Sequence, residues 1–332
     1  MPRKEGQKAK ILILLQILEQ NTDETHRMTV PQLAAALEAQ GVPCERKSIY
    51  TDIAALQQMG YDIEMQRGPG GGYYMASRSF QLPELKLLVD AVQSSRFITQ
   101  RKSRELIKKL ESLASKHQAS LLSRQVYVAG RAKSDNESAY YSVDTLHEAI
   151  NSGKMVQFTY SKWGPDKKKH PRNEGKPYQV SPWALVWENN GYYLIAYQDY
   201  AQPANIRHYR VDKMSRVKIL DQARRGQQQF RDFDLSAYLQ QMFNMFGAKQ
   251  VHKVTLRCHN SMADAMLDRF GTGVTLMEEE DGAHFHFTVP VAVSPQFLGW
   301  VCGFGDLVQI TGPDPVVQEM RQLAQALAGQ YL

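Results

Sequence analysis

A short polar segment contains side chains that favour contact with nucleic acid. Its members are Arg46, Lys47, Ser48, Tyr50 and Thr51. Guanidinium, ammonium and hydroxyl groups donate hydrogen bonds to phosphates and to the edges of bases. The interleaved apolar residues recur at i, i+4 and i+7, so they should face a core and turn the polar group outward; they are Ile49, Ile53 and Leu56. The spacing therefore predicts a helix whose exposed face contacts DNA.

A two-stranded wing is predicted directly after this helix. Gly60 stands where a helix end favours a residue with positive φ. The alternation in residues 61–65 predicts a strand, the glycine-rich segment 68–72 predicts a turn, and a second strand begins at Tyr73. Arg67, beside this turn, is a further candidate DNA contact.

Two more helices are predicted upstream. Residues 8–18 form an apolar run that predicts a buried helix, and Thr29 and Gln32 fit the capping box of a second helix that ends near Gly41. Helix, short turn, helix and wing in this order are the arrangement of a winged helix-turn-helix, so residues 1–80 are expected to bind DNA. The alternative is a small helical bundle with a hairpin and no ligand.

Charge is distributed unevenly along the 332 residues, whose net charge is +6. Residues 1–80 are neutral, residues 81–125 and 126–235 each have a net charge of +5, and residues 236–332 have −4. A neutral DNA-binding region neutralises few phosphates, so its non-specific affinity for DNA should be modest. The overall excess weakly favours a polyanionic partner.

Residues 81–125 are predicted to form a helical connector of two helices, separated by the polar stretch 94–104. Apolar residues share a face before this stretch (Leu85, Leu88, Val89, Val92) and another after it (Leu106, Leu110, Leu113). The basic side chains here are interpreted as solvated surface, with a nucleic-acid patch as the alternative; they are Arg101, Lys102, Arg104, Lys108 and Lys109.

Residues 126–235 are predicted to form a small β-barrel. Short β-rich runs, beginning with VYVAG at 126–130, are broken by Asn-Asn-Gly at 189–191, and a helix is expected at 142–152. The insertion 162–176 contains six Lys and Arg and is interpreted as a mobile solvated loop; closing over an anionic ligand or trailing along DNA are alternatives. Residues 236–332 alternate strand and helix, which predicts a small α+β domain for assembly or gating.

Cysteine usage and the lack of targeting signals indicate a cytoplasmic protein. Cys44, Cys258 and Cys302 are odd in number and form no CxxC pair, which indicates reduced thiols and argues against structural zinc. The first apolar run has no signal-peptide cleavage site and is too short to span a membrane. His284 and His286 share a face of a predicted strand, but a third ligand at a telling spacing is missing, so no metal site is expected.

Catalytic motifs do not occur in a matching context. GxSxG, HExxH, P-loop and dinucleotide-binding patterns are missing from the sequence or from the strand and helix settings that they need. We therefore expect no catalytic residue, no cofactor and no enzymatic activity.

The order of these signals resembles the WYL-domain transcriptional regulators of bacteria. The resemblance rests on PWALVWENNGYYLIAYQ (182–198), RHYRVDKMSRV (207–217) and the ending from Phe297. The signature tripeptide is Tyr192-Tyr193-Leu194, with Tyr in place of the first Trp. Many members of the class have an Arg just before the Asp of the recognition helix; here Thr51 precedes Asp52, which weakens the expected anchoring to phosphate.

The resemblance implies an SH3-like or Sm-like barrel that binds a ligand, often one derived from nucleic acid, in a homodimer. The candidate ligand residues carried over are Tyr160, Ser181, Trp183, Tyr193, Arg207, His208, Tyr209 and Arg210. Arginine binds phosphate with two parallel hydrogen bonds, and aromatic rings stack on bases. The alternative is that the aromatic residues form the barrel core. On a regular strand Arg207 and Arg210 face opposite sides, unless a bulge intervenes.

The expected fold is multidomain α+β: a winged helix-turn-helix (1–80), a helical connector (81–125), a barrel (126–235) and a C-terminal α+β domain (236–332). The expected function is a cytoplasmic DNA-binding transcriptional regulator, and we favour a repressor over an activator. It would bind an inverted-repeat operator as a homodimer and sense a nucleotide or another anionic ligand. The alternatives are a nucleic-acid-binding accessory protein without sequence preference and an uncharacterised hydrolase.

Overall fold

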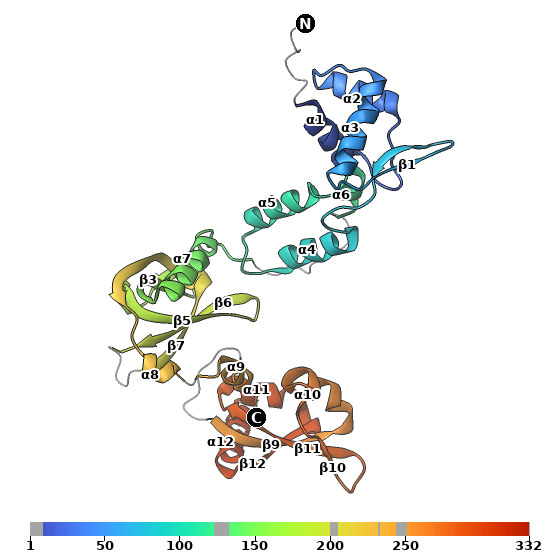
Figure 1. Cartoon of the computed structure of the whole chain (residues 1–332). Coiled ribbons are helices and arrows are strands. Elements are labelled where there is room, and N and C mark those ends of the chain that lie inside the picture. The colour runs from blue at the N-terminus through green and yellow to red at the C-terminus, as the bar shows by residue number, and fades with distance from the viewer. Residues whose placement is uncertain (1–8, 123–132, 200–204, 232, 244–250, 332) are drawn as a thin grey trace. The chain divides into compact units, whose positions relative to one another are not determined.

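The computed structural model describes residues 9–122, 133–199, 205–231, 233–243 and 251–331 (Figure 1). The chain divides into two compact units, Met1–Glu137 and Ser138–Leu332. Both combine helices with sheets, so the expectation of a multidomain α+β chain is confirmed. The expected strand at 126–130 and the expected boundary at 125 lie outside the described residues.

The first unit begins with three helices and a two-stranded wing (Figure 1). The predicted capping box is present, because Thr29 N donates to Gln32 Oε1 at 2.7 Å and Gln32 N donates to Thr29 Oγ1 at 3.4 Å. Gly60 has the positive φ expected of it, 95°. The elements are α1 (Lys10–Asn21), α2 (Val30–Ala39), α3 (Arg46–Gln58), β1 (Ile63–Gln66) and β2 (Gly72–Met75).

One apolar core holds these helices together. Leu14, Leu33, Leu37 and Ile49 are fully buried in it, and Ile53 is 2% exposed. Since burial of a Leu or Ile side chain contributes about 1.5–3 kcal/mol, this core fixes the orientation of α3. The predicted apolar face of α3 is therefore confirmed.

The connector that follows contains three helices rather than the predicted two. They are α4 (Leu82–Ser94), α5 (Gln100–Glu111) and α6 (Lys116–Leu122). The polar stretch ends earlier than predicted, because the Thr99 side chain caps α5 by accepting from Lys102 N at 3.2 Å. Leu88 was expected on the buried face, but it is 38% exposed while Leu85 and Val89 are buried.

The second unit begins with a helix on a half-barrel sheet. The strand order is β8-β3-β5-β6-β7, with β4 paired to the far part of β3. Helix α7 ends at Gly153, which has a positive φ of 64°. The elements are α7 (Ala139–Ser152), β3 (Lys154–Trp163), β4 (Lys169–Pro171), β5 (Tyr178–Glu188), β6 (Gly191–Gln198), β7 (Asn205–Arg210) and β8 (Met214–Ala223), with short 3-10 turns η1 (Asn173–Gly175) and η2 (Val211–Lys213).

Two turns of this sheet follow from their residue types. Asn189 and Asn190 have positive φ angles of 49° and 61°, which suits the tight hairpin between β5 and β6. The basic insertion was interpreted as a mobile loop, but it forms a β-hairpin in which Lys162 pairs with His170 and Trp163 with Lys169. The insertion is exposed, as a solvated segment should be, but part of it is paired backbone, because β3 extends to Trp163 and pairs with β4.

The C-terminal part contains a four-stranded sheet in the order β10-β11-β9-β12. Its core includes Phe287, Phe297, Val301 and Val316, all fully buried. Two short helices, α8 (Gln227–Phe230) and α9 (Leu235–Gln241), precede it; the remaining elements are β9 (Val251–His259), α10 (Ala263–Phe270), β10 (Met277–Glu278), β11 (His284–Ala292), α11 (Pro295–Cys302), β12 (Val308–Gly312) and α12 (Asp314–Tyr331), with turns η3 (Asn260–Met262) and η4 (Gly305–Leu307).

The three cysteines are free thiols. Among the described helices, none is long and apolar enough to cross a membrane.

Candidate nucleic-acid interface and ligand face

The exposed face of α3 gathers most of the predicted DNA contacts. Arg46, Lys47, Tyr50 and Thr51 are exposed, and Tyr50 has 46% of its surface accessible. The Tyr50 ring meets the edge of the Tyr73 ring of the wing at a centroid distance of 6.4 Å. The helix and the wing thus form one continuous surface, on which Arg67 is also exposed.

Ser48 differs from the other five, because it faces α1. The ammonium group of Lys10 donates to Ser48 Oγ at 2.8 Å and lies 2.7 Å from a carboxylate oxygen of Asp52. The Lys10 and Asp52 side chains are only 13% and 17% exposed. Lys10 therefore joins α1 to α3 and neutralises the Asp52 carboxylate.

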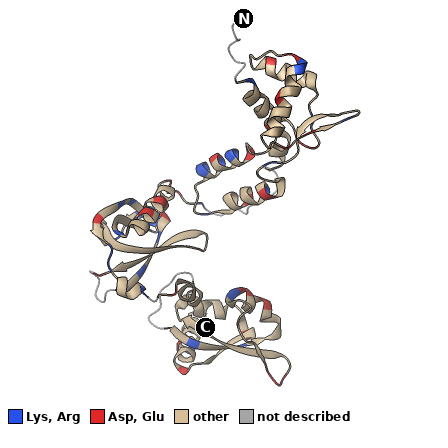
Figure 2. Ribbon diagram, viewed as in Figure 1, with Lys and Arg blue, Asp and Glu red and all other residues tan. Residues whose placement is uncertain are grey.

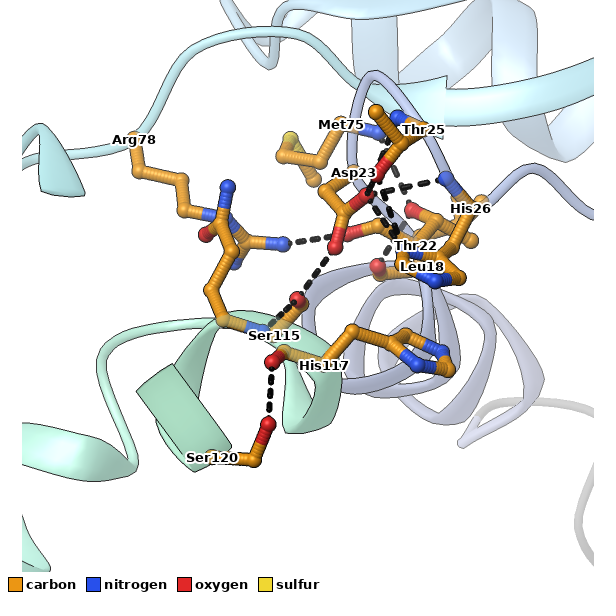
Figure 3. Close-up of polar contacts among 11 residues, drawn as sticks. Leu18, Thr22, Asp23, Thr25, His26, Met75, Arg78, Ser115, His117 and Ser120 are labelled. Carbon is orange, nitrogen blue, oxygen red and sulfur yellow. Dashed lines mark hydrogen bonds and ion pairs between the residues drawn. The ribbon is translucent and has the colours of Figure 1, made fainter. Parts of the chain in front are cut away.

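A polar cluster joins the winged domain to α6 of the connector (Figure 3). Asp23, 3% exposed, accepts from Ser115 Oγ at 2.5 Å, from Thr25 Oγ1 at 2.9 Å and from His26 Nδ1 at 2.8 Å. The rings of His26 and His117 stack at 3.6 Å, with planes only 3° apart. The Asp23–Ser115 hydrogen bond and the His26–His117 stack both link the loop after α1 to the start of α6. The cluster therefore fixes the winged domain on its connector.

Hydrogen bonds govern the charge state of Asp23. Burial raises its pKa, but the hydrogen bonds from Ser115, His26 and Thr25 outweigh burial and hold the pKa well below its usual range. The neighbouring Thr22 extends the cluster, because its carbonyl accepts from Arg78 Nη2 at 2.7 Å. Asp23 is therefore a carboxylate at neutral pH, held by the donors around it.

Cations in the connector lie mainly on α5, where Figure 2 shows Lys and Arg along the helix. Lys102 forms an ion pair with Glu105 at 3.2 Å, and both side chains are partly exposed. Exposed pairs contribute little to stability, so this face agrees with the solvated surface expected from the sequence.

The half-barrel places six of the eight predicted ligand residues in two sets. Tyr160, Ser181 and Tyr209 are 8%, 1% and 6% exposed. The rings of Tyr160 and Tyr209 pack edge to face at 5.4 Å, and both contact Phe158. These three residues lie in the barrel core, which for Tyr160 and Tyr209 is the alternative that the sequence left open.

The other set spans the opposite face of β6 and β7. Tyr193 is paired with Arg210, and Ile195 with His208, so Tyr193, His208 and Arg210 point to the same side. Arg207 is exposed and, by strand alternation, points to the other side. Only one of the two arginines can therefore serve this face, as strand geometry predicted.

Positive charge gathers beside Tyr160 and Tyr193. Arg210 lies 5.9 Å from the centre of the Tyr193 ring, and Arg172 lies 5.9 Å from that of Tyr160. Burial lowers the pKa of Lys213, and repulsion from Arg210 lowers it further. Asp212 partly offsets this charge, since it binds the Arg210 guanidinium with both oxygens, at 3.1 and 2.8 Å.

Trp183 lies between two flat groups. The Arg224 guanidinium is 3.9 Å from the centre of its ring, and the Phe230 ring stacks at 4.5 Å with planes 5° apart. The indole N–H donates to the Arg225 carbonyl at 2.9 Å. This arrangement makes Trp183 a stacking surface with a fixed orientation.

Family comparison decides the class of the chain. Residues 142–219 match the family model of the WYL domain, and residues 250–328 match that of the WCX domain. The chain is a WYL-domain protein. The WYL match spans α7 and most of the half-barrel, with the Tyr192-Tyr193-Leu194 signature in β6, and the resemblance inferred from the sequence is confirmed.

Two solved structures are similar to this WYL-domain protein. One is the proteasome accessory factor B/C (PafBC) of Arthrobacter aurescens, with 16% identity, a TM-score of 0.28, and coverage of 98% of this chain and 49% of that chain. The other is a CRISPR Cas-related protein, with 12% identity, a TM-score of 0.37, and coverage of 90% and 77%. The chain thus spans about half the length of the PafBC structure. No curated protein gave a significant match.

The WCX domain of the WYL-domain protein contains a cluster of groups of the kind that bind metals. Suitable atoms of Glu279, Asp281 and His284 lie within 4.8 Å of one another. However, Arg257 binds Glu279 at 2.8 Å and Asp281 at 2.9 Å, so a guanidinium already neutralises both carboxylates. The sequence analysis paired His284 with His286 and did not anticipate that Glu279 and Asp281 lie beside His284.

Several functional candidates of the WYL-domain protein were missed from the sequence. Asp23 stands two residues before Thr25 in a typical Asx turn, a signal for the turn but not for its distant partner Ser115. Arg172 lies in the basic insertion, whose hairpin was not predicted. Phe230 stands among glutamines, and no spacing pattern links it to Trp183.

Proposed function

We propose that this WYL-domain protein is a transcriptional regulator that binds a specific DNA sequence through α3 and the wing. The observation that supports this most is the exposed group Arg46, Lys47, Tyr50 and Thr51 on a helix whose other face is buried. An exposed helix of this kind beside a wing is suited to the major groove, where bases differ in their hydrogen-bonding groups.

We propose that the WYL domain binds an anionic ligand beside Tyr193. Arg210 lies beside Tyr193, Lys213 lies near Arg210, and Arg172 lies beside Tyr160, while Asp212 and Glu188 are acidic groups that count against them. Such an excess of partly buried positive charge favours a phosphate, and the neighbouring rings favour a nucleotide or a nucleic-acid fragment.

The ligand would act by favouring one arrangement of the DNA-binding domains over another. We propose a homodimer, because a neutral winged domain gains affinity when two copies bind adjacent half-sites. We further propose that this dimer represses transcription when no ligand is bound. A coupling of about 1–3 kcal/mol between ligand and DNA would change operator affinity about five- to 150-fold.

Footprinting on the DNA that flanks the gene tests this proposal. A protected inverted repeat is expected from a sequence-specific dimer. Diffuse protection that tracks no sequence would favour a non-specific nucleic-acid-binding accessory protein. A reporter gene behind the protected site then distinguishes repression from activation.

A further inference from the structure

The WYL sheet holds an aromatic slot that the chain itself fills. Trp183 lies in the middle, with the Arg224 guanidinium over its ring at 3.9 Å and the Phe230 ring stacked on it at 4.5 Å. Proteins bind nucleobases by stacking them on the flat face of an aromatic ring, and the Trp183 ring has two such faces. Here a phenyl ring from the protein occupies one of the two positions.

The Arg224 side of the slot is rigid. Arg224 N donates to the Gly153 carbonyl at 2.8 Å, and its Nη1 donates to the Ile150 carbonyl at 3.2 Å. Trp183 is held through its indole N–H by the Arg225 carbonyl, while Arg225 N donates to Ser181 Oγ at 2.8 Å. Trp183 and Arg224 would thus keep their positions if Phe230 left.

The Phe230 side is weakly held. Helix α8 has only four residues, of which Gln227, Gln228 and Gln229 are exposed, so Phe230 is its contact with the sheet. It follows Gly226, whose φ is 88° and which lies against the Tyr197 ring. Phe230 also packs on Phe233 at 4.9 Å and on the apolar cluster around Ile195. Leu235, Tyr238 and Leu239 of α9 pack on the same cluster, so loss of one ring from a four-residue helix uncovers it only in part.

We propose that Phe230 is an internal substitute for a nucleobase, which a nucleotide-type ligand displaces from Trp183. This inference rests on the proposed ligand binding by the same domain and adds its mechanism. A base stacks on Trp183 as a phenyl ring does, and Arg224 and Arg225 add positive charge beside Trp183, although Asp199 pairs with Arg225 at 2.6 Å. A ligand with a base and a phosphate can therefore compete with the internal ring.

Displacement of Phe230 would reach beyond the WYL domain. The following helix α9 lies on the same sheet face, where Tyr238 Oη and His208 Nε2 are 2.9 Å apart. The chain then continues to Met242, whose carbonyl accepts from Arg269 of α10 at 2.6 Å, and to Phe243, which packs on Phe297. A ligand that removes Phe230 therefore acts on the segment that joins the WYL sheet to the WCX core.

Two variants open the slot by different means. Phe230→Ala removes the ring. Gly226→Ala keeps the ring but adds a Cβ 2.4 Å from Tyr197 Cγ at a positive φ. The backbone before α8 or the Tyr197 ring must then shift, and we expect α8 to move from the sheet. Gln229→Ala, at an exposed position of the same helix, is the matched control, and a thermal melt confirms that each full-length variant is folded.

Calorimetry with AMP and with ribose 5-phosphate tests the proposal. Both opening variants should bind AMP about two- to tenfold more tightly than the wild type, because a competing stacked ring is gone. Ribose 5-phosphate, which has the phosphate but no base, should bind all variants equally. Adding Trp183→Ala to Phe230→Ala should abolish the gain, and Gln229→Ala should change nothing.

The proposal is overturned if Phe230→Ala leaves AMP affinity unchanged or lowers it, or if neither the wild type nor the variant binds AMP. An equal gain for ribose 5-phosphate would also overturn it, since the base would then play no part. Footprinting is run separately on the wild type. Absence of a footprint counts against the proposed DNA-binding function. The AMP affinities test, independently of DNA binding, whether a ligand displaces Phe230 from Trp183.

Discussion

Ser115 donates a 2.5 Å hydrogen bond to Asp23, a residue 92 positions earlier in the chain. This bond joins the loop after α1 to the start of α6, beside the stacked rings of His26 and His117. The winged domain is therefore attached to its connector by a buried, charged hydrogen-bond cluster rather than by apolar packing alone.

Asp23→Asn should destabilise the first unit by about 1–3 kcal/mol, because hydrogen bonds to a carboxylate are replaced by weaker ones. The folded pKa of Asp23 is depressed, so its contribution is complete above about pH 4 and is lost as pH falls toward the folded pKa. Urea unfolding of wild type and variant between neutral and acidic pH checks this. If the difference in the free energy of unfolding between wild type and variant stays constant down to the lowest pH, the stabilising role of the Asp23 carboxylate is contradicted.

Lys47→Ala and Tyr50→Ala should each weaken binding to the footprinted operator, by about 1–3 kcal/mol for each lost base contact. Fluorescence anisotropy with labelled operator duplex measures the change. Lys108→Ala, an exposed lysine of α5, is the control with the same change of charge. Unchanged operator affinity in both α3 variants would show that α3 does not read DNA.

Lys10→Met should reduce operator affinity although Lys10 itself faces α3 rather than solvent. It leaves the Asp52 carboxylate unpaired on the helix that we propose to contact DNA, and removal of one partner of a largely buried ion pair costs about 3–5 kcal/mol of stability. Asp52→Asn in the same chain should restore much of both losses. A double-mutant cycle measures the coupling, and strictly additive losses would argue against the pair.

Arg210→Gln should hold a reporter gene in one regulatory state while operator affinity in vitro stays at the wild-type value. Arg210 lies on the Tyr193 face of the sheet. Arg207→Gln is the matched control, because its side chain is exposed on the opposite side. If both variants respond normally to the inducing condition, the ligand face lies elsewhere.

Light scattering should give the mass of a homodimer at micromolar concentration. A neutral winged domain has little non-specific attraction to DNA, so two linked domains are needed for tight operator binding. A monomer with undiminished operator affinity would contradict this expectation.

Local signals in the sequence predicted much of the fold. The Thr29 capping box, the positive φ of Gly60 and the Asn189-Asn190 hairpin each depend on neighbouring residues, which a sequence displays directly. The start of α5 was misplaced because charged residues fit both a loop and an exposed helix, and the deciding cap at Thr99 was not recognised.

The candidate sites were less predictable because they depend on distant partners. Tyr160 and Tyr193 are both tyrosines in predicted strands, and the sequence does not distinguish them. Tyr160 lies in the core, whereas Tyr193 lies on the opposite sheet face with His208. Strand alternation did separate Arg207 from Arg210 in advance. The ring that covers Trp183 is Phe230, which follows three glutamines. No local sequence pattern predicts that this short turn packs on Trp183.

The short helices α8 and α9 determine where this protein can be divided for expression in parts. Phe230, Leu235, Tyr238 and Leu239 shield an apolar cluster around Ile195. A fragment that ends with β8 at Ala223 would leave that surface open to water and prone to self-association. A soluble WYL fragment should therefore extend to Gln241, and a WCX fragment should begin no later than Met242, so that Phe243 remains in its core.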